Sequence, residues 1–200
     1  MSLLPFYDSK LIEAGCDEAG RGCLSGPVVA AAVILPKDYK NNLLDDSKKL
    51  SEKARFALKE TIERDALAWG VAFVDNIKID EINILNASIL AMNLAVNKLS
   101  ISPDLLLIDG NRFKSDGKPF HCFVKGDGRF LSIAAASILA KTHRDLYMNK
   151  LDAEYPVYKW SKNKGYPTKD HCEGIIKNGY TEYHRKSFVV KSLYQTKLDL

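Results

Sequence analysis

Residues 11–36 read LIEAGCDEAGRGCLSGPVVAAAVILP and contain two apolar runs separated by a glycine-rich turn. The runs 11–17 and 28–35 have the composition of strands, and the turn between them predicts that the two strands pair. Asp17 and Glu18 stand where the first strand ends. Two carboxylates about 4 Å apart repel by roughly 4 kcal/mol at an effective dielectric near 20, and a bound divalent cation reverses this cost. A solvated loop is the alternative interpretation of an isolated Asp-Glu pair.

The turn Gly20-Arg21-Gly22 can approach a ligand closely, because glycine takes positive φ and carries no side chain. Its guanidinium suits a phosphate group. The rival interpretation is a dinucleotide fingerprint, G-x-G-x-x-G. Against it, Gly26 falls one position late and a strand follows where a helix should begin. No G-x-x-x-x-G-K-[ST] motif occurs in the chain, which excludes a P-loop.

The bulk composition sets limits without naming a function. Two hundred residues suit one domain with its own core, and a net charge of +4 permits nucleic acid as a partner without requiring it. The four cysteines show no C-x-x-C pairing, which predicts free thiols in a reducing compartment. The N-terminus lacks the features of a signal peptide, and we expect no apolar run to reach the length of a membrane span. We therefore expect a cytoplasmic protein.

Strand and helix signals alternate along the rest of the chain, which predicts an α/β fold. Ser51 is a good N-cap for a helix to about Arg64, and Asp80 is predicted to cap a long helix. The other expected elements are strands at 67–74, 105–108 and 122–124, a helix from about Phe130, a short helix capped by Thr168 or Asp170 and ending near Asn178, and a further helix in the tail to Leu200.

Acidic residues follow three of these strands in glycine-flanked turns. Asp109 comes directly after the buried strand 105–108, and Asp127 follows strand 122–124. For Asp127, a charge at the N-terminus of the next helix is the competing interpretation. Hard divalent cations take oxygen ligands, and two metals about 3.5 to 4 Å apart can activate water and stabilise a leaving oxygen. The pattern predicts metal-assisted hydrolysis of a phosphodiester.

The last third of the chain combines lysines with aromatic residues, which suits a surface that neutralises phosphates and stacks on a base or sugar. A basic loop over a small apolar patch is the alternative. Lys48 and Lys49, ahead of the first predicted helix, are either solvated charges or phosphate contacts. Arg144 and Asp145 are interpreted as a surface pair on their helix.

These segments, in this order, resemble ribonuclease HII, the type 2 ribonuclease H family. The resemblance runs from about residue 11 to 188 and implies a ribonuclease H-like α/β fold, a central mixed five-stranded sheet flanked by helices, with a C-terminal helical extension. We expect a catalytic core at 1–155 and a basic, aromatic part at 156–200. The matching segments are DEAGRG at 17–22 with GPV at 26–28, DSKKL at 46–50, IDG at 108–110, KGD at 125–127, AAASILAK at 134–141 with Arg144-Asp145, GYPT at 165–168 with His171, and RKSF at 185–188.

The same resemblance implies an endoribonuclease that hydrolyses the RNA strand of RNA/DNA hybrids and incises duplex DNA 5′ of an embedded ribonucleotide, as in ribonucleotide excision repair and DNA replication. It implies Mg²⁺ or Mn²⁺, with two ions in the active complex, and a monomer without membrane attachment. The residue roles that it implies are metal binding and catalysis by Asp17, Glu18, Asp109 and Asp127, recognition of the 2′-hydroxyl by Gly20, Arg21 and Gly22, and stacking on the neighbouring deoxyribose by Tyr166. Beside these, we expect Lys48, Lys49 and Arg185 to bind substrate through phosphate contacts, with solvated charge as the alternative.

Two segments depart from the family pattern: Cys23-Leu24-Ser25 occupies a stretch where less polar small residues are usual, and Gly128-Arg129-Phe130 is a variable stretch. Two further hypotheses remain beside the enzyme. One is a hybrid-binding module without catalysis, which an alteration at any of the four acids would favour, and all four are present. The other is a nucleotide-binding enzyme with a dinucleotide turn, against which Gly26 and the following strand argue.

Overall fold

The computed structural model describes residues 3–44 and 50–188. Its centre is one five-stranded sheet in the order β3-β2-β1-β4-β5. The β1–β2 and β2–β3 pairs are antiparallel, whereas β1–β4 and β4–β5 are parallel. This mixed sheet confirms the predicted fold class and the predicted pairing through the glycine turn. The strands are β1 (Glu13–Ala19), β2 (Val28–Ile34), β3 (Ala68–Val74), β4 (Leu105–Asp109) and β5 (Phe120–Phe123).

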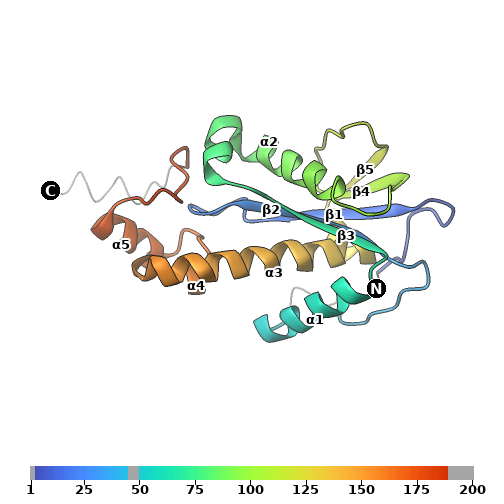
Figure 1. Ribbon diagram of the computed structural model, residues 1–200, viewed down its shortest axis with the longest axis horizontal. Helices are drawn as coiled ribbons and strands as arrows, with labels where there is room; N and C mark the ends of the chain where they lie inside the picture. The colour runs from blue at the N-terminus through green and yellow to red at the C-terminus, as the bar shows by residue number, and fades with distance from the viewer. Residues whose placement is uncertain (1–2, 45–49, 189–200) are drawn as a thin grey trace.

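Helices cover both faces of the sheet (Figure 1). α2 (Asn76–Val96) lies on one face, and α3 (Leu131–Glu154) lies on the other with α1 (Glu52–Asp65) beside it. All seven residues of β2 are buried, as expected for a strand covered on both sides. Their side chains alternate between a core cluster shared with α2 and one shared with α3. The alternation of β2 thus builds two apolar cores.

α3 packs very close to β1. The alanine run of this helix is fully buried, and a β-carbon at Gly15 would overlap the backbone of Ser132 and Ile133. Small residues on both sides permit this approach. The consequence is that side chains one turn farther along α3 lie beside the carboxyl end of β1.

The helix caps explain one wrong prediction. Asp75, not Asp80, caps α2, since its Oδ1 accepts a hydrogen bond of 2.8 Å from the backbone N–H of Lys78. Asp80 lies within the helix and instead accepts hydrogen bonds from the backbone N–H groups of Lys186 at 2.8 Å and Ser187 at 3.0 Å. Asp80 therefore anchors a segment about a hundred residues away, a role that local sequence signals do not reveal.

The C-terminal part packs on the far end of α3 (Figure 1). Its elements are η3 (Pro156–Tyr158), α4 (Trp160–Asn163) and α5 (Lys169–Asn178), and Thr168 caps α5 as predicted. Tyr158, Trp160 and Ile175 form a buried cluster with Met148 and Leu151 of α3. The predicted tail helix extends beyond residue 188, where the described residues end. Lys48 and Lys49 lie between residues 44 and 50 and are likewise outside the described residues.

Among the described residues, one helix could cross a membrane by length and composition, which the sequence did not lead us to expect. This helix is α2, with a mean hydropathy of 1.3 over its most apolar window. Its apolar residues pack against the sheet in the same core as β2 and β3.

Candidate active site

Asp17 and Asp109 stand at one edge of the sheet because their strands are parallel neighbours. The last paired residues of β1 and β4 are Cys16 and Ile108, so each aspartate lies one residue beyond that pair. Asp17 is 6 % exposed. The two aspartates that the sequence places at strand ends are therefore neighbours, Asp17 buried and Asp109 half-buried.

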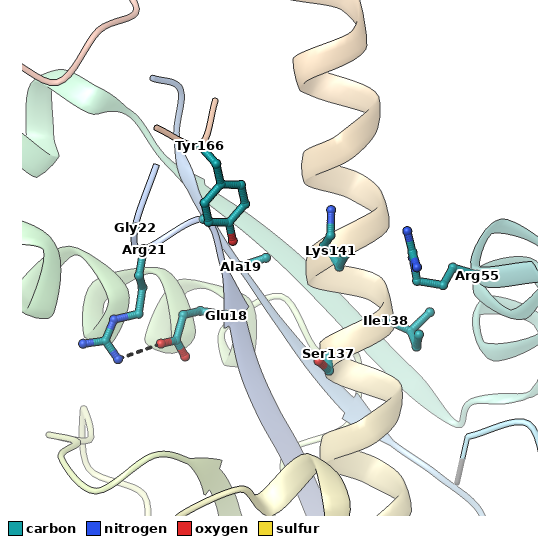
Figure 2. Close-up of a pocket in the computed structure, with 10 residues that line it drawn as sticks. Glu18, Ala19, Arg21, Gly22, Arg55, Ser137, Ile138, Lys141 and Tyr166 are labelled. Atoms are coloured by element: carbon teal, nitrogen blue, oxygen red, sulfur yellow. Dashed lines mark hydrogen bonds and ion pairs between the residues drawn. The ribbon is translucent and has the colours of Figure 1, made fainter. Parts of the chain in front are cut away.

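Glu18 follows Asp17 on the opposite face of β1, because successive side chains of a strand alternate. Its Oε1 forms an ion pair of 3.1 Å with Nη1 of Arg21, drawn as a dashed line in Figure 2. Its other oxygen, Oε2, is buried and has no hydrogen-bond partner. A buried carboxylate oxygen without a partner is costly, and a bound cation would remove that cost.

The pKa values of these acids also favour a bound cation. Burial is the main cause that raises the pKa of Asp17 well above its ordinary value, and the charges of Glu18 and Asp109 raise it further. Hydrogen bonds from Ser137 and from the Glu18 backbone N–H lower this pKa in part. Burial also raises the pKa of Glu18, although Arg21 opposes the shift. Three carboxylates thus repel one another in a poorly hydrated place.

Asp127 lies in the short 3-10 turn η2 (Gly126–Gly128), which the structure places against Asp109. The backbone N–H of Gly126 donates a hydrogen bond of 2.6 Å to Asp109 Oδ1. Asp127 is itself buried, at 9 % exposure. The N-cap of α3 is Phe130, whose side chain makes no capping hydrogen bond, and Asp127 lies three residues before it.

These acids suit a divalent cation without forming a complete cage for one. Across residues 3–44 and 50–188, no three His, Cys, Asp or Glu side chains form a group that could hold a metal ion. Mg²⁺ is commonly held by one or two carboxylates, with waters and substrate phosphates as its other ligands. The unpartnered Glu18 Oε2 and the raised pKa values of Asp17 and Glu18 fit that mode of binding.

A cavity of about 400 Å³ opens beside Glu18 (Figure 2). The turn Gly20-Arg21-Gly22, the predicted readout turn, forms one wall of this cavity. Tyr166 lies above the end of β1, with its hydroxyl directed toward Ala19. The Tyr166 ring lies close to Gly22, where an added β-carbon would be 3.9 Å from Cε1. The structure therefore brings together Glu18, Gly20, Arg21, Gly22 and Tyr166 around one cavity.

The opposite wall holds three polar residues that no sequence pattern indicated as site residues. Ser137 and Lys141 come from α3 and Arg55 from α1. Lys141 forms an ion pair with Asp145, and Nη1 of Arg55 donates a hydrogen bond of 2.6 Å to the carbonyl of Leu50. The four-residue spacing of Ser137 and Lys141 on a helix was the available signal, because it places both side chains on one face.

Arg144 shows that the predicted surface pair was wrong. Arg144 and Asp145 are each 1 % exposed. The Arg144 guanidinium donates hydrogen bonds to the carbonyls of Ser25 at 3.0 Å, Pro27 at 2.9 Å and Lys164 at 2.7 Å. This arginine holds the loop that follows the readout turn, and its partners come from segments too distant in sequence for a local pattern to indicate them.

Arg185 holds the same loop from the other side. Its Nε donates to the carbonyl of Gly26 at 3.0 Å and its Nη1 to that of Arg21 at 2.9 Å. The side chain is 1 % exposed, and burial lowers its pKa to about 10. In the described structure Arg185 thus faces the loop backbone and not solvent, which favours an anchoring role over the predicted phosphate contact.

A mixed five-stranded sheet, helices on both faces, and acids at the carboxyl ends of two adjacent parallel strands define the ribonuclease H-like class of protein. Solved structures agree. The ribonuclease H2 from Pyrococcus horikoshii OT3 matches with a TM-score of 0.74 and 23% identity over 94% of this chain and 97% of that one. Bst-RNase HIII in complex with Mn²⁺ matches with a TM-score of 0.74 and 20% identity over 94% and 70%. Identities this low establish the fold alone.

Sequence relatives establish the family. The family model for Ribonuclease HII matches residues 14–197. Ribonuclease HII of Bacteroides thetaiotaomicron is 64% identical over 187 residues, which are 93% of this chain and 94% of that one. Ribonuclease HII of Porphyromonas gingivalis is 53% identical over 189 residues, 94% of each chain. The chain belongs to the ribonuclease HII family, a family of metal-dependent endoribonucleases.

Proposed function

We propose that this chain hydrolyses the RNA strand of RNA/DNA hybrids and incises duplex DNA on the 5′ side of a single embedded ribonucleotide, leaving a 3′-hydroxyl and a 5′-phosphate. One observation carries the proposal: a carboxylate at a strand end, a glycine-rich turn and an exposed tyrosine line one cavity. Membership of the ribonuclease HII family supports the reaction class.

The acids would hold Mg²⁺ or Mn²⁺, with two ions in the active complex. Asp17, Glu18 and Asp109 are coupled through their charges, and Asp127 lies in the turn bonded to Asp109. Divalent metal bound there would activate the attacking water and neutralise charge on the leaving oxygen. The Mn²⁺ complex of Bst-RNase HIII supports divalent metal use in this fold.

The turn would distinguish ribose from deoxyribose. A 2′-hydroxyl is both a donor and an acceptor, so backbone N–H and C=O groups of a turn can bind it. Gly22 leaves this side of the cavity open, since an added β-carbon there would contact only Tyr166. The ring of Tyr166, 41 % exposed, would stack on the neighbouring deoxyribose.

The surroundings of the site would receive the duplex. We propose phosphate contacts for Lys48 and Lys49, in keeping with the basic charge of the chain. We also propose a cytoplasmic monomer, which the four free cysteines support for the compartment because disulfides are rare in the cytosol. The core at 1–155 would carry the acids and the turn, and residues 156–200 would supply Tyr166.

Cleavage of a labelled DNA duplex with one ribonucleotide tests the proposal, in Mg²⁺, in Mn²⁺ and in chelator, beside an all-DNA duplex. We expect metal-dependent incision 5′ of the ribonucleotide and an intact control. Cutting of both duplexes would keep the metal site and remove the role of the turn. Binding without cutting by folded protein would favour the hybrid-binding module.

A further inference from the structure

Three segments meet behind the cavity. The loop after β1 lies between the segment that carries Tyr166 and the segment that follows α5. The Leu24 N–H donates to the Gly165 carbonyl at 2.7 Å, and on its other side the Leu24 carbonyl accepts from the Arg185 N–H at 2.8 Å. The Gly26 N–H donates to the Tyr183 carbonyl at 2.9 Å. A displacement of any one segment would therefore also displace the other two.

Two histidines, both 0 % exposed, lie at this junction. His171 comes from α5, and its Nδ1 is 2.9 Å from the carbonyl oxygen of Tyr166. Its Nε2 is 2.9 Å from Nε1 of Trp160 and 3.3 Å from Nε2 of His184. Nδ1 of His184 is 2.9 Å from the backbone N–H of Thr181. No catalytic step proposed above uses either ring.

These partners fix both tautomers. A carbonyl only accepts and an indole N–H only donates, so His171 carries its proton on Nδ1 and accepts at Nε2. The Thr181 backbone N–H only donates, so His184 accepts at Nδ1 and carries its proton on Nε2. The proton of His184 then points at Nε2 of His171, whose single lone pair also accepts from the Trp160 indole N–H. A directed chain of hydrogen bonds runs from Thr181 through both rings to Tyr166.

The main chain of Tyr166 is the end point of that chain. Its carbonyl accepts from His171 Nδ1 at 2.9 Å and from the Thr168 N–H at 2.8 Å, and its N–H donates to the Asn163 carbonyl at 2.9 Å. These bonds hold the Tyr166 backbone on both sides, and the Tyr166 ring lies close to Gly22. The remaining neighbour of His171 Nε2, the Ser25 hydroxyl at 3.2 Å, belongs to the loop after β1.

We propose that His171 is a positioning residue for Tyr166, and that the donors of Trp160 and His184 at Nε2 together hold His171 in the one tautomer that can donate to the Tyr166 carbonyl. The proposal rests on the proposed function, because it assigns a means of placing the stacking ring. It requires both rings to be neutral, since an extra proton would set one N–H against another. In agreement, burial and the neighbouring His171 lower the pKa of His184 to about 4.

A double-mutant cycle in cleavage of the single-ribonucleotide duplex tests this proposal. Tyr166→Ala removes the stacking ring and is expected to lower kcat/KM roughly tenfold, the size of one base-stacking contact. His171→Gln keeps an acceptor near the Nε2 position but lacks the Nδ1 donor. If His171 acts through Tyr166, His171→Gln lowers kcat/KM in the wild type but has no further effect beside Tyr166→Ala. Additive losses would overturn the proposal.

His171→Asn is the matched variant. Its amide can take the place of Nδ1–H, so it should recover most of the kcat/KM that His171→Gln loses, and it should do so without equal recovery of thermal stability. Equal cleavage by the two variants, at equal stability, would contradict positioning through the Tyr166 carbonyl.

Binding gives a readout that does not need turnover. In an Asp17→Asn background, fluorescence anisotropy measures the affinity for a labelled duplex with one ribonucleotide. His171→Gln and Tyr166→Ala should weaken it by the same factor, and the double variant by no more than that factor. If the enzyme binds but never cuts, the proposed function fails while this cycle still decides the role of His171. Independent losses of affinity would overturn it.

Discussion

The guanidinium of Arg144 occupies the space that a β-carbon at Gly20 would fill. Gly20 has φ of +94°, a conformation that L side chains rarely adopt. The shape of the Gly20-Arg21-Gly22 turn therefore depends on Gly20, which directly follows β1, and on the buried Arg144 of α3. A β-carbon added at Gly22, two residues away, would have the Tyr166 ring as its nearest neighbour, at 3.9 Å.

This difference predicts opposite results for two small substitutions. Gly20→Ala should lower the free energy of unfolding by about 3 kcal/mol, since it adds backbone strain and displaces a buried charged group. Gly22→Ala should leave it within about 0.5 kcal/mol but reduce cleavage at a single ribonucleotide at least tenfold, because the added methyl faces the proposed 2′-hydroxyl subsite. Urea unfolding and duplex cleavage measure the two effects. Full activity in Gly22→Ala would remove that subsite from the turn.

The buried acids predict a link between metal binding and stability. Asp17→Asn removes a buried charge that Glu18 and Asp109 repel, so without metal this variant should unfold at the same or a higher temperature than the wild type. It should also lose roughly a thousandfold or more in cleavage. Divalent metal at about 100 times its dissociation constant should stabilise the wild type by about 2.7 kcal/mol and the variant by much less.

Thermal unfolding with Mn²⁺ and with chelator checks this prediction, and Glu173→Gln on the exposed side of α5 serves as a control acid far from the strand ends. An equal metal-induced shift in Asp17→Asn and wild type would mean that the metal binds elsewhere.

The burial of Arg185 predicts how salt should act on its variants. Arg185→Lys should lower stability by about 2 kcal/mol, because it loses the fork that reaches two carbonyl groups. The slope of log affinity against log salt should stay unchanged. By contrast, Lys48→Ala or Lys49→Ala should each reduce that slope by about 0.9 if the residue contacts a phosphate.

Duplex binding measured by anisotropy between 50 and 200 mM salt, a range in which phosphate contacts are sensitive to salt, separates the two roles. A reduced slope in Arg185→Lys with unchanged stability would restore the phosphate contact that the sequence suggested.

The histidine pair predicts acid sensitivity. Both pKa values are lowered in the fold, that of His184 to about 4, against an ordinary value near 6.5. The unfolded chain therefore takes up protons first, and stability should fall as pH decreases from about 6.5 to about 4, by roughly 1.4 kcal/mol per unit through His184, with His171 acting in the same direction. The two rings contact Tyr158, Trp160 and Tyr180, and burial raises the pKa of Tyr158 still further above this range.

The difference between wild type and His184→Asn in urea unfolding at several pH values isolates this effect from the carboxylates common to both. His184→Asn should show the smaller decline below pH 6.5. Parallel curves for the two proteins would contradict a neutral buried pair.

The sequence predicted the features that depend on local order. Asp17, Asp109 and their strands follow from apolar runs ending in glycine turns, and parallel pairing then brings the two acids together. It failed where burial depends on distant segments. In the sequence Arg144 and Arg185 resemble surface charges, but distant segments bury both of them in the fold. Asp80 resembles a helix cap, but its carboxylate binds the backbone of residues 186–187. The tautomers of His171 and His184 likewise exist only in the folded junction.

The most direct test of the account is incision of a DNA duplex that carries one ribonucleotide, compared between wild type and Gly22→Ala in Mg²⁺, in Mn²⁺ and in chelator. We predict a metal-dependent cut 5′ of the ribonucleotide by the wild type, an intact all-DNA duplex, and at least a tenfold loss in the equally stable variant. Cutting of the all-DNA duplex at the same rate, or cutting in chelator, would contradict it.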